Sequence, residues 1–194
     1  MSKRIASPTA TGLRVFVAID LPDHVREELR ILQQGLNIGR RVPAENLHLT
    51  LSFLGEQPDE AIVEAHQALS TVHVCAFDLR LAGVGTLGGR MPQVITAEVL
   101  QCDDLNDLEK RIVRSLRSAG LTFKKQRFRP HITLARLQKS STDYELARVH
   151  DYLADYATFQ GTSFTVKRFS LYQSTLRPKA ALHEILASYD LLDA

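Results

Sequence analysis

Cysteine is scarce in this 194-residue chain, which contains only Cys75 and Cys102, in unrelated sequence contexts. Two such residues make no disulfide framework, and their scarcity is typical of proteins of the reducing cytoplasm. No apolar run approaches the roughly 20 residues that span a bilayer, and Met1 to Leu13 lacks the apolar core of a signal peptide. We therefore expect a soluble cytoplasmic protein with no membrane partner and with a flexible leader over residues 1–13.

An excess of charge of one sign is also missing. Lysine and arginine number 24 and aspartate and glutamate 22, so the formal net charge is only +2. This balance argues against a protein that coats nucleic acid, although it is compatible with a local basic cleft. Apolar residues make up 44% of the chain. That proportion is enough for the core of one domain, which we place over residues 14–194.

Apolar periodicity predicts a mixture of strands and helices. Strands are expected over 14–20, 46–55, 77–87, 93–100, 130–137, 164–173 and 183–189. Helices are expected over about 23–36, 58–71, 104–119 and 143–157. The order of elements in the first half recurs in the second, which indicates an internal duplication of roughly 80 residues. The predicted fold class is α+β, with two lobes that face each other across a cleft.

Two nearly identical motifs stand at equivalent places of this duplication, His48-Leu49-Thr50-Leu51 and His131-Ile132-Thr133-Leu134. Residues i and i+2 of a strand share a face. Each histidine therefore shares a face with its threonine, while the aliphatic residues point to the core. A hydroxyl that donates to a phosphoryl oxygen beside an imidazole that moves protons near neutral pH suits phosphate chemistry. One such motif is unremarkable on a half-buried strand, but the pair predicts a site.

Other common kinds of site are not predicted. Gly83, Gly85, Gly88 and Gly89 are scattered and precede neither a helix nor a lysine-serine pair, so we assign them to turns rather than to a phosphate loop. A catalytic zinc needs three protein ligands. No third histidine, cysteine or carboxylate recurs beside the two motifs. We therefore expect no metal and no cofactor.

Three segments carry a resemblance to a known family. RVFVAIDLP from residue 14, VPAENLHLTLSFLG from residue 42 and FRPHITLARL from residue 128 are similar, in this order, to blocks of the two-histidine (2H) phosphoesterases. Within that group the chain resembles the bacterial and archaeal RNA 2′,3′-cyclic phosphodiesterases, long named 2′-5′ RNA ligases. The resemblance implies a metal-independent enzyme with a bilobal fold. In that fold two pseudo-two-fold-related lobes, each with a small antiparallel sheet and flanking helices, surround a central cleft.

The same resemblance assigns roles to individual residues. It makes His48 with Thr50, and His131 with Thr133, the catalytic pairs. It implies that His131 is the proton acceptor and His48 the proton donor to the 3′ oxygen, which leaves a 2′-phosphate. The near symmetry of the motifs cannot by itself distinguish these two roles. Arg136 falls on an arginine of the family that holds phosphate. Because strict alternation would turn its side chain away from His131, a bulge or the strand's end must redirect it.

The segment that leads into His131 has the composition of an RNA-binding element. Residues 123–129 interleave four cations with two phenylalanines, a pattern in which cations meet backbone phosphates and aromatics stack on bases. Lys125, Arg127 and Arg129 are the candidates, with a solvated loop anchored by its phenylalanines as the alternative. Phe16 is a further candidate for base stacking, with core packing as the alternative.

The family resemblance has two departures at the end of the chain. The family often places a tyrosine after a late basic loop, and here His183 stands in that place. The loop itself, residues 175–180, carries only Arg177 and Lys179 as cations. The resemblance therefore leaves the part that this loop plays in binding RNA open.

The expected partner is RNA that ends in a 2′,3′-cyclic phosphate, tRNA fragments included, and the expected enzyme is a monomer. Three alternatives stay open. If the same residues catalysed the reverse reaction, the protein would be a 2′-5′ RNA ligase. If the substrate were smaller than RNA, it would be a cyclic-nucleotide phosphodiesterase, and if the site were inactive, it would be an RNA-binding module. Since water is present at about 55 M, hydrolysis is the expected net direction unless a second RNA end is well held.

Overall fold

The computed structural model describes residues 12–89, 91–138, 142–178 and 180–193, so most of the expected leader and Lys179 lie outside the described residues. Its helices are α1 (Asp23–Gln34), α2 (Asp59–Ser70), α3 (Asp103–Ser118) and α4 (Asp143–Asp155). Its strands are β1 (Leu13–Asp20), β2 (Arg40–Arg41), β3 (His48–Gln57), β4 (Phe77–Leu79), β5 (Leu81–Leu87), β6 (Val94–Val99), β7 (His131–Arg136), β8 (Phe164–Val166), β9 (Arg168–Thr175) and β10 (Leu182–Asp190). A 3₁₀ turn at Ala44–Asn46 leads into β3.

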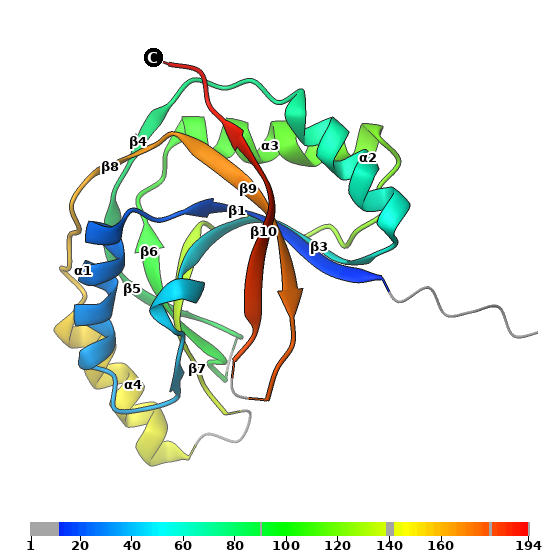
Figure 1. Ribbon diagram of the computed structural model, residues 1–194. Coiled ribbons are helices and arrows are strands. Elements are labelled where there is room, and N and C mark those ends of the chain that lie inside the picture. The colour runs from blue at the N-terminus through cyan, green and yellow to red at the C-terminus, as the bar shows by residue number, and fades with distance from the viewer. Residues whose placement is uncertain (1–11, 90, 139–141, 179, 194) are drawn as a thin grey trace, which may run out of the picture.

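The strands form one antiparallel sheet in the order β10-β9-β1-β3-β7-β6-β5, with β2 added beside β7. The sheet is narrowest at its middle, where β3 and β7 are joined by the single pair Leu49 and Ile132. We call the strands on either side the β3 half-sheet (β10-β9-β1-β3) and the β7 half-sheet (β2, β7-β6-β5). Figure 1 shows the strands of the two half-sheets diverging around the centre of the molecule. The two histidine strands therefore lie at the junction between them.

Each half-sheet takes strands from both halves of the chain. The strands β9 and β10, from the end of the sequence, add to β1, whereas the β5–β6 hairpin, from the first half, adds to β7. The short strands β4 and β8 pair with each other as a separate two-stranded sheet. The two halves of the chain are thus interleaved rather than folded one after the other, so neither half can bury its apolar surface alone.

Helices from the two halves of the chain also contact each other, α2 with α3 and α1 with α4. Figure 1 shows these two pairs on different sides of the sheet region. The spacing of Leu105, Leu108, Ile112 and Leu116 gives α3 one apolar stripe, and all four side chains are fully buried. One continuous apolar core connects both half-sheets with all four helices. Of the helices in the described ranges, none has the length and apolar character needed to cross a membrane.

Two strands are shorter than the sequence pattern predicted. The strand expected over 77–87 is divided at Arg80 into β4 and β5, and the one expected over 164–173 is divided at Lys167 into β8 and β9. The break lets each first segment leave the large sheet and join its counterpart. The predicted turn at Gly88 and Gly89 is confirmed, because both residues have positive φ angles there, of 123° and 73°. Such backbone angles favour glycine.

Candidate active site

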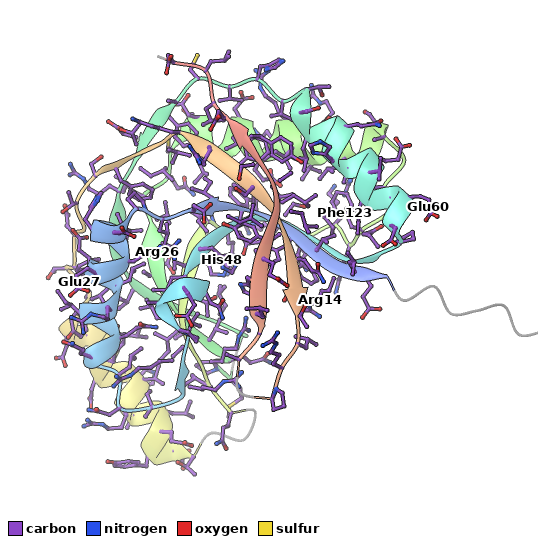
Figure 2. All side chains as sticks on the ribbon, in the orientation of Figure 1. Arg14, Arg26, Glu27, His48, Glu60 and Phe123 are labelled. Atoms are coloured by element: carbon purple, nitrogen blue, oxygen red, sulfur yellow. The ribbon has the colours of Figure 1, made fainter. Side chains whose placement is uncertain are left out.

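The two motifs meet where the half-sheets join. Leu49 pairs with Ile132 in antiparallel register. In that register His48 lies alongside Thr133, and Thr50 alongside His131, all on one face of the sheet. The opposite face of the two strands is formed by fully or almost fully buried side chains, Leu49, Leu51, Ile132 and Leu134. Figure 2 shows His48 near the centre of the molecule. The two His-Thr pairs expected from the sequence therefore lie side by side, and each histidine is opposite the threonine of the other pair.

Both imidazoles are held in the same way. Nδ1 of His48 lies 2.8 Å from the carbonyl oxygen of Asn46, and Nδ1 of His131 lies 2.6 Å from the carbonyl oxygen of Arg129. A carbonyl oxygen only accepts, so each Nδ1 carries the proton and donates it. The Nε2 atom of each ring is therefore the one left to exchange a proton with a ligand.

A bulge after each threonine places one further side chain on the histidine face. In β7, Thr96 and Ile95 of the neighbouring strand pair with Thr133 and Ala135, so Leu134 is the extra residue. The alternation of faces shifts there, which puts Arg136 on the side of His131. Of the two devices that could redirect Arg136, a bulge or the end of the strand, the structure has the bulge. The equivalent bulge in β3, at Leu51, places Phe53 on the side of His48.

His48 stands in an aromatic wall. Its ring centroid lies 4.7 Å from that of Phe16, 5.2 Å from that of His183 and 6.3 Å from that of Tyr172. The pKa of His48 is lowered to about 4, chiefly by burial and in smaller part by the nearby charges of His183 and Arg136. The hydrogen bond to Asn46 and the carboxylate of Asp20 act in the opposite direction. In the ligand-free protein His48 is therefore neutral at pH 7.

The start of β3 is anchored from several elements. The Arg26 guanidinium donates to the carbonyl oxygens of Ala44 and Leu47, at 2.9 Å each. The Asn46 side chain donates to the carbonyl oxygen of Ala181 at 2.7 Å. Asp20, which pairs with His48 across the strands, accepts a hydrogen bond from Tyr172. These contacts hold the His48 ring in place without blocking its Nε2 atom.

A cavity of about 350 Å³ collects the site residues. It is lined by both histidines, both threonines and Arg136, together with Phe53, Asn46, Gln126 and His183. The side chains of His48, Thr50, His131 and Thr133 are half-buried, and Arg136 is exposed. The cavity also contains Arg40 and Arg41, so three guanidinium groups, two hydroxyls, two amides and one apolar ring surround the imidazoles. This lining is suited to an anionic ligand of nucleotide size.

The RNA-binding candidates lie in two different environments. Lys125, Arg127 and Arg129 are exposed and line a second, larger cavity of about 810 Å³ that adjoins the first. Phe16 is only 3% exposed, and it stacks on Tyr172 at 5.0 Å with a 6° angle between the rings. The Phe16 ring therefore packs against the His48 ring, and its exposed surface is too small for a base to stack on.

Within the described ranges, no three histidine, cysteine or carboxylate side chains come together as a metal-binding group. The described side chains that line the cavity with His48 and His131 carry hydroxyl, amide, guanidinium and ring groups and no carboxylate or thiol.

Three residues of the cavity were not singled out by sequence reasoning. Phe53 stands five residues after His48, as Arg136 stands five after His131, so an alignment of the two motifs would have found it. Asn46 contacts His48 through its backbone oxygen, which every residue has, so no sequence pattern could have identified it. His183 stood out only as a departure from the family, and it proves to face both His48 and Phe16. Burial lowers the pKa of His183, with Arg136 and Arg14 adding to the effect.

Comparison with known proteins agrees with this geometry. The sequence signature of the 2′-5′ RNA ligase superfamily matches residues 21–177. The RNA 2′,3′-cyclic phosphodiesterase of Archaeoglobus fulgidus is 30% identical over 182 residues, which cover 92% of this chain and 100% of that protein. The structure of apo LigT from Escherichia coli has a TM-score of 0.75 at 26% identity, and the match covers 94% of this chain and 99% of that one. The chain therefore belongs to the 2′-5′ RNA ligase superfamily, as the twin histidine motifs predicted.

Proposed function

We propose that this protein hydrolyses the 2′,3′-cyclic phosphate at the end of an RNA to a 2′-phosphate, without a metal, through His48 and His131. The observation that carries the proposal is the pair of imidazoles at the half-sheet junction, each with Nδ1 bound to a carbonyl and Nε2 left for a ligand. The relative from Archaeoglobus fulgidus is an RNA 2′,3′-cyclic phosphodiesterase by name, which supports the proposed substrate. We further propose that the protein acts as a monomer in the cytoplasm, on tRNA fragments among other RNA ends.

The reaction requires two proton transfers at opposite sides of the phosphorus. Nε2 of His131 takes a proton from a water molecule, whose oxygen forms the new bond to phosphorus. The bond between phosphorus and the 3′ oxygen breaks, and Nε2 of His48 donates a proton to that oxygen. Thr50, Thr133 and Arg136 donate hydrogen bonds to the phosphoryl oxygens, on which negative charge increases in the transition state.

The low pKa of His48 is compatible with its role as the acid once substrate is bound. A phosphate anion about 4 Å away, at an effective dielectric constant of about 20, stabilises an imidazolium by about 4 kcal/mol. That energy raises a pKa by about three. The pKa of His48, about 4 in the ligand-free protein, would then lie close to 7. We propose that binding of the phosphate and protonation of His48 occur together.

This coupling predicts two titrations of one histidine. In NMR spectra the His48 ring should titrate near pH 4 in the free protein, because burial disfavours its charged form. With 2′-AMP bound, the same ring should titrate near neutral pH. Spectra of His48→Gln identify the resonance. A pKa of His48 that 2′-AMP leaves unchanged would contradict the coupling.

The proposed function is tested by offering the protein RNA with a 2′,3′-cyclic phosphate end and uridine 2′,3′-cyclic phosphate side by side, with a strong chelator present. We expect turnover of the RNA with chelator and a phosphomonoester as the product. Loss of activity in chelator that a divalent ion restores would favour a metal enzyme. Faster turnover of the mononucleotide would favour a small-nucleotide phosphodiesterase, joined RNA ends would favour a ligase, and no turnover of either compound would favour a non-catalytic binding module.

A further inference from the structure

The larger cavity, of about 810 Å³, opens directly off the catalytic one. Thr50, Phe53, Gln126 and His131 line both cavities. A strand whose end occupied the catalytic cavity would therefore find a continuous path past these four residues. We call the larger cavity the α3 groove, because one wall is the helix α3 and the other is the segment 123–129.

The wall formed by α3 is basic. Lys110, Arg114 and Arg117 line the groove, and all three are exposed. They recur at intervals of four and three residues, which places them on one face of the helix over two turns, about 10 Å in length. The apolar stripe of α3 faces away from them into the core. The face that α3 turns to the groove is thus a row of cations.

The opposite wall adds four more cations, Lys124, Lys125, Arg127 and Arg129, all exposed. Phe123 and Phe128 hold this segment to the core while also lining the groove. The Arg117 guanidinium lies 5.4 Å from the ring of Phe123, so the two walls are in contact at one end. Figure 2 shows Phe123 on the side of the molecule where α2 and α3 lie.

The groove cations are not neutralised within the protein. Among the described residues that line the groove, Glu109 is the one acidic side chain. Burial raises its pKa, while the charges of Lys110 and Arg117 act in the opposite direction, so one carboxyl group faces seven cations. No ion pair in the described part of the chain involves any of the seven cations. Arg111, on the same helix but outside the groove, is by contrast paired with Asp107 at 2.6 Å. The positive charge of the groove is therefore available to an external polyanion.

We propose that the α3 groove binds the nucleotides that precede the cyclic phosphate, with their backbone phosphates between the cations of α3 and those of 123–129. This inference rests on the proposed function and names its substrate more closely, as a single-stranded RNA of several nucleotides rather than a mononucleotide. A chain with a net charge of only +2 that gathers seven unpaired cations in one groove beside the site is built to attract a polyanion there. Phe123 and Phe128, which line the groove, offer apolar contact to bases.

The double variant K110Q/R114Q tests the proposal. Its substrates are hexauridylate that ends in a 2′,3′-cyclic phosphate and uridine 2′,3′-cyclic phosphate, which share one reacting group. The ratio of kcat/KM for the hexanucleotide to kcat/KM for the mononucleotide should fall roughly tenfold, since two phosphate contacts are lost. The slope of log affinity for the hexanucleotide against log salt concentration should fall by about 1.4, or about 0.7 for each phosphate. Arg111→Gln, a charge removal on the same helix outside the groove, should change neither quantity.

Other outcomes would overturn the groove assignment. Equal losses for both substrates would mean that Lys110 and Arg114 act at the reaction centre, and no change of the ratio or the salt slope would mean that RNA takes another path. Binding of the hexanucleotide, measured by fluorescence anisotropy, does not depend on turnover. If the wild-type protein hydrolysed neither substrate, the proposed function would fail while the salt slopes of the two variants still decided the groove.

Discussion

Replacement of His48 or of His131 by alanine should lower kcat by about 10²–10⁴-fold, the usual range for loss of a general acid or base. In the proposed reaction the two proton transfers occur in one step at one phosphorus, so each imidazole depends on the other. The double variant should therefore be little worse than the worse single variant, because groups that act as a unit are not additive. Turnover of cyclic-phosphate RNA in steady state measures both effects.

The control for this prediction is His150→Ala, which removes an exposed histidine on α4, far from the motifs in sequence. It should keep wild-type turnover. Thermal unfolding of the two catalytic variants should remain cooperative, since both rings are only half-buried and their strands are held by the aliphatic residues of the opposite face. Turnover within a fewfold of wild type in either single variant would exclude that histidine from the reaction.

A substrate with sulfur in place of the 3′ oxygen should restore most of the activity that His48→Ala loses. An alkoxide is a poor leaving group and requires a proton from the acid, whereas a thiolate leaves with little protonation. The loss of about 10²–10⁴-fold should shrink to within about tenfold on the sulfur substrate. His131→Ala should gain nothing, because the attacking water still lacks its base. The experiment distinguishes the general acid from the general base, since both histidines leave Nε2 for a ligand in the same way.

The product isomer provides a second, independent readout of the same assignment. Phosphorus NMR of the wild-type product should show a 2′-phosphate, since His48 protonates the 3′ oxygen. Rescue of the His131 variant in place of the His48 variant, together with a 3′-phosphate product, would reverse the two roles. In that case the low pKa of His48 in the free protein would suit a general base directly, without a shift on binding.

The local features of the site follow from short-range rules. Alternation within HLTL and HITL places each histidine beside its threonine, because successive side chains of a strand point to opposite faces. The position of Arg136 required either a bulge or the end of the strand, and the bulge at Leu134 provides the change of face. Most strand and helix positions were predicted in the same way, since apolar periodicity depends on residues within one or two turns of each other.

The partners of each strand depend on contacts between residues far apart in the chain. A repeat of about 80 residues is compatible with two separate lobes or with interleaved ones, because both arrangements bury the same apolar faces. The structure has the interleaved arrangement, with β9 beside β1 and β6 beside β7. Leu49 and Ile132, 83 positions apart in the sequence, join the two half-sheets and set the His48 and His131 rings against one cavity.

The electrostatic character of His48 likewise arises from distant segments. Phe16, Tyr172 and His183 come from three strands and surround one imidazole, which removes water from it and lowers its pKa. Composition and spacing identify His48 as a candidate, but its protonation state depends on solvent exposure and on charges nearby in space. Those quantities exist only once the chain has folded, because the groups that exclude water from His48 lie up to 135 residues away along the chain.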